Sequence, residues 1–459
     1  MREVPWRDPL VAFTPFANDS VAALLHGDGV DEMGRWSYMA VSPFSVLNVD
    51  GSMHTTVDGA SVAGDAFDVL NDLLRHYSMT STQSPAPFCG GAVGFYGYEL
   101  GHLVEKLPEP RNGATDPAMV VGLYDVVMAF DHRDHKAWVM SSGFPETDPG
   151  RRAKRADTRA QWVIDQIDKA SPQAPITTLS QWSADQDRHV IERSIEDAIE
   201  YIKAGDIFQA NITQRYTATK PEEVIAWELF RRLRTIVSSP FGAYIAGASE
   251  FQVLSASPER FLHVTRCGKV ETRPIKGTRP RHKDPTVDAS LAMELKNSAK
   301  DQAENLMIVD LMRNDISRVC EPGSVTVPQR CAVETFTRVH HLVSVIAGQL
   351  RRDKTAVDLL RACFPGGSVT GAPKVRAMEV IHDLEPVARG PYCGAIGWIG
   401  FDGAMDTSIV IRNLTVDGDK VIAQAGGGIV ADSDPELEYE EAMVKIRPLL
   451  SVLDPTALT

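Results

Sequence analysis

The chain has 459 residues, of which 43% are hydrophobic and 24% charged, a composition typical of a globular protein and not of a disordered or collagen-like one. Its 47 Lys and Arg residues against 61 Asp and Glu leave a net charge of −14, which argues against general binding to nucleic acid or anionic membranes. The sequence lacks an apolar run of roughly 18 residues, an apolar signal core and a Cys-x-x-Cys pair, so it predicts a cytoplasmic protein with reduced thiols and no membrane partner.

The clearest change in composition lies between residues 144 and 188. A Pro- and Gly-containing turn opens it, a charged helix is expected over residues 151–169, and residues 170–175 have the composition of neither helix nor strand. We therefore expect two lobes, residues 1–175 and residues 176–459.

Strands and helices alternate irregularly along both lobes. The pattern predicts strands over residues 119–128, 137–140, 242–246, 251–255, 261–265, 270–273, 392–401, 406–416 and 420–425. It predicts helices over residues 187–204, 291–315, 333–350, 356–363, 374–383 and 435–450. Short turns containing Gly268, Gly403 and Gly418 favour antiparallel hairpins, so we expect an α+β fold with large antiparallel sheets covered by helices.

Two helices each carry a pair of carboxylates three residues apart. Asp301 and Glu304 share one helical face, and Glu438 and Glu441 share another. Two such pairs can hold one Mg²⁺, which prefers oxygen ligands. By spacing alone, two solvated acidic helix faces explain these pairs as well, and more commonly.

Lys276 lies where an apolar strand ends, in the string Arg273–Arg279. At the rim of a sheet it can project into a cleft, and desolvation or neighbouring cations favour the neutral amine that a nucleophile needs. An ordinary solvated hairpin lysine is the alternative that local sequence favours.

The Gly-rich strings Phe364–Lys374 and Ala425–Ile429 can direct backbone N–H groups toward an anion such as a carboxylate, or can be simple tight turns. His341 follows His340 in an apolar stretch, where a histidine is more often a half-buried structural residue than a catalyst.

Taken together, these features resemble the family of chorismate-utilising enzymes. The resemblance covers about residues 183–450, and it is looser in the first lobe, through Gly34–Tyr38 and Phe88–Glu99. In the second lobe it rests on motifs in the family's order: Gly205–Gln209, Ser257–Phe261, Pro274–Thr278, Ala303–Asp315, His341–Ser344, Pro365–Lys374 and Gly426–Val430.

Two positions discriminate within this family. Lys276 stands where anthranilate synthases have alanine and aminodeoxychorismate synthases have lysine. Gln209 stands where isochorismate and salicylate synthases carry the lysine that activates water. The chain is therefore most similar to the branch that aminates chorismate, with an anthranilate synthase component I-like fold of two antiparallel sheets packed as a sandwich with helices outside.

The resemblance implies a transferase that converts chorismate and ammonia to 4-amino-4-deoxychorismate, on the route to p-aminobenzoate and folate, through a covalent lysine adduct. Lys276 would be the nucleophile and Glu259 the proton shuttle, with Thr278 and His341 lining the reacting ring. The family's substrate-binding positions fall on Tyr392, Arg412, Gly427, Gly428 and Lys445. Its Mg²⁺ ligands fall on Glu304 and Glu441, with Asp301 and Glu438 adjoining them.

The resemblance also implies that residues 176–459 form the chorismate-binding catalytic lobe and residues 1–175 a regulatory or structural one. The sequence contains no Gly-x-Cys-x-Gly glutaminase motif, so we expect ammonia from a separate glutamine amidotransferase subunit. His26-Gly27 after Leu24-Leu25 makes tryptophan feedback doubtful. Two alternatives remain, an anthranilate synthase component I, which forms anthranilate and pyruvate, and a catalytically silent regulatory subunit.

Overall fold

Two antiparallel β-sheets dominate the computed structural model, which describes residues 1–29, 31–80, 84–109, 117–169, 180–247, 250–336 and 338–458. Each sheet has twelve strands within those ranges. In sheet A the order is β1 (Arg2–Val4), β10 (Lys136–Ser141), β9 (Val126–Asp131), β3 (Trp36–Ala40), β2 (Ala23–His26), β13 (Phe241–Ala246), β14 (Phe251–Ser257), β23 (Asn413–Asp417), β24 (Lys420–Ile429), β12 (Gln209–Thr219) and β11 (Ser183–Ala184), and β20 (Gly371–Ala372) also pairs with β12. In sheet B the order is β17 (Ile275–Pro280), β19 (Val339–Gln349), β16 (Lys269–Thr272), β15 (Arg260–Val264), β22 (Met405–Ile409), β21 (Ala395–Gly400), β7 (Gly91–Tyr96), β8 (Met119–Tyr124), β4 (Ser45–Val49), β5 (Thr55–Val57) and β6 (Ala60–Ser61), and β18 (Thr326–Thr335) also pairs with β19.

The two sheets pack face to face around a shared apolar core. Phe95 and Val93 on β7 belong to the same buried cluster as Phe251 and Val253 on β14, and the rings of Phe95 and Phe251 lie 5.7 Å apart. Alternate residues of each strand point into this layer and the others point outward, as the pleat of a strand requires. The predicted α+β sandwich is confirmed.

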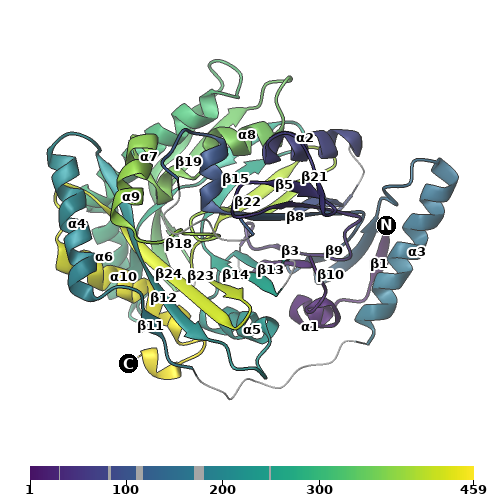
Figure 1. Ribbon diagram of the computed structural model, residues 1–459, viewed down its shortest axis with the longest axis horizontal. Coiled ribbons are helices and arrows are strands. Elements are labelled where there is room, and N and C mark those ends of the chain that lie inside the picture. Colours follow the sequence, from purple (N-terminus) through teal and green to yellow (C-terminus); the bar gives the residue numbers. More distant parts are fainter. Residues whose placement is uncertain are drawn as a thin grey trace.

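Helices cover the outer faces of the sandwich. Figure 1 shows α2 (Ala66–His76), α7 (Ala299–Ser317) and α8 (Ala356–Cys363) along one side of the molecule, and α1 (Pro9–Phe13) and α5 (Ala226–Ile236) on the opposite side. One buried cluster joins the first three helices to sheet B, and another joins α1 and α5 to sheet A. None of the helices in the described ranges combines the length and apolar character that a membrane crossing requires.

Both halves of the chain contribute to both sheets. The strands β1 to β10 end at residue 141, and β11 to β24 begin at residue 183, yet each sheet contains strands of both groups. The boundary predicted near residue 175 and the segment 170–175 lie outside the described residues. The two stretches therefore share one β-sandwich and its core.

Most of the predicted helices are confirmed. The structure has α3 at Pro149–Ile167, α4 at Arg188–Lys203, α9 at Lys374–Leu384 and α10 at Pro435–Leu450, and α8 has the predicted bounds. The helix expected over residues 291–315 is instead two helices, α6 (Pro285–Asn297) and α7. Ser298 separates them because its extended backbone ends α6 and its hydroxyl caps α7 by accepting a hydrogen bond from the N–H of Asp301.

The helix predicted over residues 333–350 is wrong. Strands β18 and β19 occupy this stretch, and β19 pairs with β17, β18 and β16. Residues 340–346 are buried consecutively. A strand covered on both faces loses the alternation of polar and apolar residues, so its pattern resembles a buried helix.

Two stretches predicted as single strands are each divided between the sheets. Residues 119–128 contain β8 of sheet B and the start of β9 of sheet A, separated at the buried Asp125. Residues 406–416 contain β22 of sheet B and β23 of sheet A, separated near Arg412, whose φ is 51°. At each of these points the chain leaves sheet B and joins sheet A. The sequence stays apolar through the crossing, so its pattern does not show where one strand ends and the next begins.

Candidate active site

Lys276 lies on β17, at one edge of sheet B. Its amine donates a hydrogen bond to the carbonyl oxygen of Ser368 at 3.0 Å. Burial lowers the pKa of Lys276, while the carboxylates of Glu304 and Glu259 oppose this shift and the Lys445 ammonium reinforces it. The predicted position at a sheet rim is confirmed, and the amine faces several charged groups.

Gly277 allows β17 to approach α7 closely. Its φ is +74°, and a Cβ at this position would lie 2.7 Å from Cγ of Asp301. The pairing of β17 with β19 also changes register between Lys276 and Thr278. Such an irregularity redirects side chains at the edge of a sheet. Gly277 therefore influences the directions of the side chains on either side of it, Lys276 and Thr278.

Glu259 lies where the chain passes from β14 of sheet A to β15 of sheet B. It is 5% exposed, and burial raises the pKa of its carboxyl. A hydrogen bond with the Ser368 side chain, the charge of Lys276 and the backbone N–H of Ile275 oppose that shift. The carboxyl is therefore close to Lys276 and favours its protonated form more than a solvated glutamate does.

Ser368 contacts both of these groups. Its carbonyl oxygen accepts the hydrogen bond from Lys276, and its side chain bonds with Glu259. The sequence analysis identified the Gly-rich string Phe364–Lys374 as a possible anion-binding loop, but it predicted no role for Ser368 within that string. The only sequence feature that could have pointed to Ser368 is its position among the glycines of this string.

Thr278 and His341 lie side by side, with Oγ1 of Thr278 2.9 Å from Nδ1 of His341. Burial and the nearby Arg412 lower the pKa of His341 to about 3, so the imidazole is neutral near pH 7. His340 points elsewhere, with its two ring nitrogens bonded to Thr335 and Asp288. Successive residues of a strand face opposite ways, which separates the two histidines.

Arg412 lies at the second crossing between the sheets, and burial lowers the pKa of its guanidinium. The positive charge of Arg412 lowers the pKa of His341, so the two side chains lie near one another. Within the part of the chain that the structure describes, no carboxylate forms an ion pair with Arg412. A half-buried, unpaired guanidinium is suited to binding a substrate carboxylate.

The predicted metal-binding carboxylates come from α7 and α10, and they converge. Asp301 and Glu438 raise the pKa of Glu304, as burial does more strongly, whereas Lys276 and Lys300 lower it. The Lys300 amine forms an ion pair with Glu438 at 3.0 Å and so joins the two helices. The Oδ2 atom of Asp301 is instead 3.3 Å from the guanidinium of Arg279.

Glu441 forms an ion pair with Lys445 at 2.9 Å, and this ammonium is the main cause of its lowered pKa. Lys300 and Lys276 contribute in the same direction. Among the described residues, no three His, Cys, Asp or Glu side chains are arranged as metal ligands. The predicted carboxylates Glu304 and Glu441 thus share the neighbouring ammonium groups of Lys276 and Lys300, but the four do not form a cluster of metal ligands, and lysines pair with Glu438 and Glu441.

The glycines of β24 leave room beside these groups. A Cβ on Gly427 would lie 3.1 Å from Oε2 of Glu438, and a Cβ on Gly428 would lie 1.9 Å from Nε2 of Gln209. Lys445 donates to the carbonyl oxygen of Gly426 at 3.0 Å. Glycine is thus required at residue 428 for the buried Gln209 amide to occupy its position.

Tyr392 is a further predicted substrate-binding residue, and it precedes Cys393, whose N–H donates to the carbonyl oxygen of Val410, two residues before Arg412. It is 4% exposed, and burial raises its pKa well above the usual value, beside Cys393 and Arg389. In the described ranges, no hydrogen bond joins it to Lys276, Arg412 or Lys445. Its assignment to the substrate site stays a prediction.

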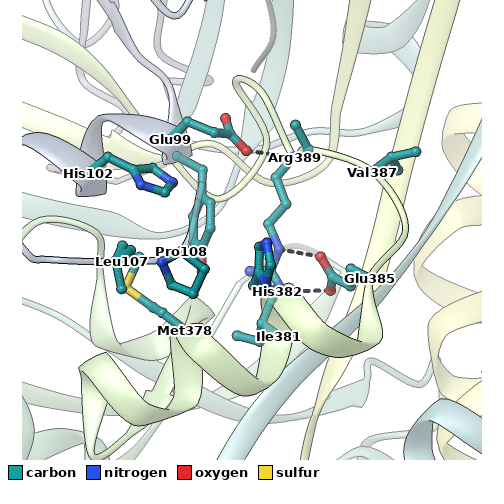
Figure 2. A pocket seen from close by; sticks show the side chains of 12 residues that line it. Glu99, His102, Leu107, Pro108, Met378, Ile381, His382, Glu385, Val387 and Arg389 are labelled. Atoms are coloured by element: carbon teal, nitrogen blue, oxygen red, sulfur yellow. Dashed lines mark hydrogen bonds and ion pairs between the residues drawn. The ribbon is translucent and has the colours of Figure 1, made fainter. Parts of the chain in front are cut away.

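A separate cavity lies between the 3₁₀ helix Tyr98–Leu103, α9 and the segment that follows α9 (Figure 2). Its lining contains Glu99, His102, His382, Glu385 and Arg389, none of which is a predicted site residue. Figure 2 shows Glu99 bonded to Arg389 from one side and Glu385 bonded to it from the other. The cavity thus exposes one end of a buried ionic network.

Glu99 makes stability depend on pH. Burial raises its pKa to about 7, although N–H groups of Arg389 and Gly390 bond to the carboxylate. Because the folded-state pKa exceeds the ordinary 4.5, the contribution of Glu99 to stability is complete below pH 4.5 and is lost as pH rises through 7. We expect the free energy of unfolding of the wild type, relative to Glu99→Gln, to fall by about 3 kcal/mol across that window. Urea unfolding of both proteins from about pH 4.5 to 8 measures this difference, and a constant difference would contradict it.

The comparisons with known proteins agree with this architecture. The chain belongs to the chorismate binding enzyme family, whose sequence pattern it matches over residues 36–451. It is 41% identical over 462 residues to aminodeoxychorismate synthase component 1 of Klebsiella aerogenes, covering 99% of both chains. It is also 41% identical over 439 residues to the protein of that name from Escherichia coli (strain K12), covering 94% of this chain and 93% of the other.

A solved structure supports the same fold. The crystal structure of anthranilate synthase component I from Streptococcus pneumoniae TIGR4 matches with a TM-score of 0.81 and 32% identity, covering 91% of this chain and 92% of that chain. The family resemblance predicted from the motifs is therefore confirmed, as is the anthranilate synthase component I-like fold.

Proposed function

We propose that this protein aminates chorismate with ammonia to form 4-amino-4-deoxychorismate, the precursor of p-aminobenzoate in folate synthesis. The observation that carries the proposal is Lys276, whose desolvated amine lies near Glu259 and Glu304. The near full-length similarity to proteins named aminodeoxychorismate synthase component 1 supports the same reaction.

Lys276 acts as the nucleophile in two displacements. Its amine bonds to ring carbon 2 while the bond from carbon 4 to the hydroxyl breaks, and both conjugated double bonds of the ring shift, from carbons 1–2 and 5–6 to carbons 1–6 and 4–5. Ammonia then bonds to carbon 4 as the bond between carbon 2 and the lysine nitrogen breaks, which restores the ring and frees the amine. The sum is chorismate plus ammonia giving aminodeoxychorismate plus water. Dividing one difficult step into two is the general advantage of covalent catalysis.

Glu259 supplies and removes the protons. Its raised pKa favours a protonated carboxyl, which gives its proton to the departing hydroxyl so that water leaves. The resulting carboxylate takes a proton from the incoming nitrogen and returns to its starting state. Ser368 keeps Glu259 and Lys276 adjacent during both steps.

The remaining predicted residues hold the substrate. Arg412 binds one carboxylate with two parallel hydrogen bonds, and Lys445 with the β24 backbone at Gly427 and Gly428 receives the other. Tyr392 is assigned to the same role. Thr278 and neutral His341 lie beside the reacting ring, where their shared hydrogen bond orients the imidazole.

The carboxylates fit Mg²⁺ in donor type, because all four predicted ligands offer oxygen atoms. Asp301 and Glu438 raise the pKa of Glu304, so negative groups converge where a cation would relieve their repulsion. Glu304 and Glu441 would hold the ion directly, with Asp301 and Glu438 adjoining them. When bound, Mg²⁺ neutralises the ring carboxylate and so eases loss of the 4-hydroxyl.

Ammonia would come from a separate glutamine amidotransferase subunit. The relatives' name, component 1, implies a second component. A regulatory or structural role for residues 1–175 stays a prediction.

One incubation tests the reaction. Purified protein, chorismate, Mg²⁺ and an ammonium salt at mildly alkaline pH are followed by mass spectrometry, with aminodeoxychorismate lyase added to a parallel tube. We expect the mass of aminodeoxychorismate in the first tube and p-aminobenzoate in the second. Anthranilate with pyruvate would replace the proposal by anthranilate synthesis.

Unchanged chorismate leads to a second incubation with the glutamine amidotransferase subunit and glutamine. Amination there would support an obligatory heterodimer. Continued inactivity together with normal chorismate binding would refute the proposal in favour of a silent regulatory subunit.

A further inference from the structure

Arg389 follows α9, and its guanidinium is among the most buried charged groups of the described chain, with 2% of the residue exposed. It donates to Oε2 and Oε1 of Glu385 at 2.8 and 2.7 Å. It also donates to the carbonyl oxygens of Val369 at 2.8 Å and Asn211 at 2.6 Å. One side chain thus joins α9, β12 and the Gly-rich loop.

The position of Arg389 is itself fixed by neighbouring elements. Its N–H donates to Glu99 at 2.8 Å, and its carbonyl oxygen accepts a hydrogen bond from Gln424 at 2.8 Å (Figure 2 shows the bond with Glu99). Glu385 in turn accepts hydrogen bonds from the N–H and hydroxyl of Thr213, each at 2.9 Å. Sheet A and the 3₁₀ helix therefore hold the guanidinium in place.

The carbonyl that Arg389 binds is adjacent to the reacting groups. Val369 follows Ser368, whose carbonyl oxygen accepts the hydrogen bond from Lys276 and whose side chain bonds with Glu259. The two peptide planes that carry these carbonyls are rigid and meet at the Cα of Val369, so only the φ and ψ of Val369 separate the carbonyl that Arg389 binds from the one that Lys276 binds. The far end of the loop is held separately, where Lys374 forms a buried ion pair with Asp315 at 2.6 Å.

We propose that Arg389 is a positioning residue for Lys276 and Glu259, acting through the backbone of Val369 and Ser368. This proposal rests on the catalytic roles proposed above for those two residues. Arginine suits the position because its planar fork binds two carbonyls and a carboxylate at once, whereas a lysine ammonium has only three donors and no fixed plane.

Arg389→Met with Glu385→Gln tests this without leaving a buried charge unpaired, since the glutamine side chain still offers Thr213 an acceptor. The matched control is Arg159→Met with Asp125→Asn, which removes another buried ion pair, one that contacts Ser42 instead of the loop. Both double variants should lose similar thermal stability. We expect the first to lower kcat by about 10- to 100-fold with little change in KM for chorismate, and the control to leave both near wild type.

Hydrogen exchange of residues 366–371 provides a measurement independent of turnover. We expect these amides to exchange at least about tenfold faster in Arg389→Met/Glu385→Gln than in the control, and Arg389→Lys to give intermediate exchange and kcat. Equal kcat losses in the two double variants, or unchanged exchange in the loop, would overturn the proposal. If the wild-type protein makes anthranilate or no product, the proposed function is refuted but the structural role of Arg389 is not. The hydrogen-exchange comparison still decides whether Arg389 holds the loop.

Discussion

Lys276→Ala is expected to lower the amination of chorismate by about 10³-fold or more, because no other described amine occupies the position from which it attacks. The Nζ atom is held 3.0 Å from the Ser368 carbonyl oxygen, and burial lowers its pKa near Glu304 and Glu259. Alanine removes the proposed nucleophile and leaves the surrounding carboxylates in place. Steady-state kinetics with ammonium as the nitrogen source measure the loss.

Lys269→Ala is the matched control, since Lys269 is an exposed lysine on β16 of the same sheet. It should retain wild-type turnover, and both variants should bind chorismate. A mass increase on the intact wild-type protein during turnover, absent from Lys276→Ala, would identify the adduct. Near-normal turnover by Lys276→Ala would exclude the covalent role.

Glu441→Gln is expected to raise the Mg²⁺ concentration needed for half-maximal activity by at least about tenfold. The carboxylate has a lowered pKa, mainly through Lys445, and is therefore ionised at neutral pH. Glutamine keeps the shape and removes the charge that would attract the cation. Because Lys445 loses its partner in this variant, Mg²⁺-dependent thermal stabilisation should be measured beside activity.

Glu440→Gln provides the control on the same helix. Glu440 pairs with Arg188 on the surface, at 2.8 Å. Its replacement should leave the Mg²⁺ titration unchanged, whereas Glu304→Gln should behave like Glu441→Gln. A Mg²⁺ titration of Glu441→Gln that coincides with the wild type would remove Glu441 from the metal site.

Local sequence located α3, α4, α8, α9 and α10 and many strands well, but it did not predict α2 or α5, and it failed where burial hides periodicity. The stretch around His340 and His341 was expected to be helical, and it is β19, covered on both faces. Runs that pass from one sheet to the other, at Asp125 and Arg412, also look continuous in sequence. Periodicity reports which face of an element is solvated, so it loses its meaning in fully buried segments.

The candidate site shows the same division. Motif order alone selected Lys276, Glu259, Glu304 and Glu441, and the structure brings these four within electrostatic reach of one another. Ser368 and Arg389 were not selected. Their roles depend on backbone carbonyl groups, which every residue possesses and which leave no signature in the side-chain sequence.

The sequence by itself determined the family and the antiparallel α+β architecture, and it selected Lys276, on which the proposal of amination at carbon 4 rests. Only the tertiary structure decided which lysine pairs with which carboxylate, which histidine faces Thr278, and that Arg389 binds the loop carbonyl next to the one that Lys276 binds. The Lys276–Ser368 contact joins residues 92 positions apart, and Lys300–Glu438 joins residues 138 apart. Such contacts are set by the packing of helices and sheets around a common core, and no local pattern of residues encodes them.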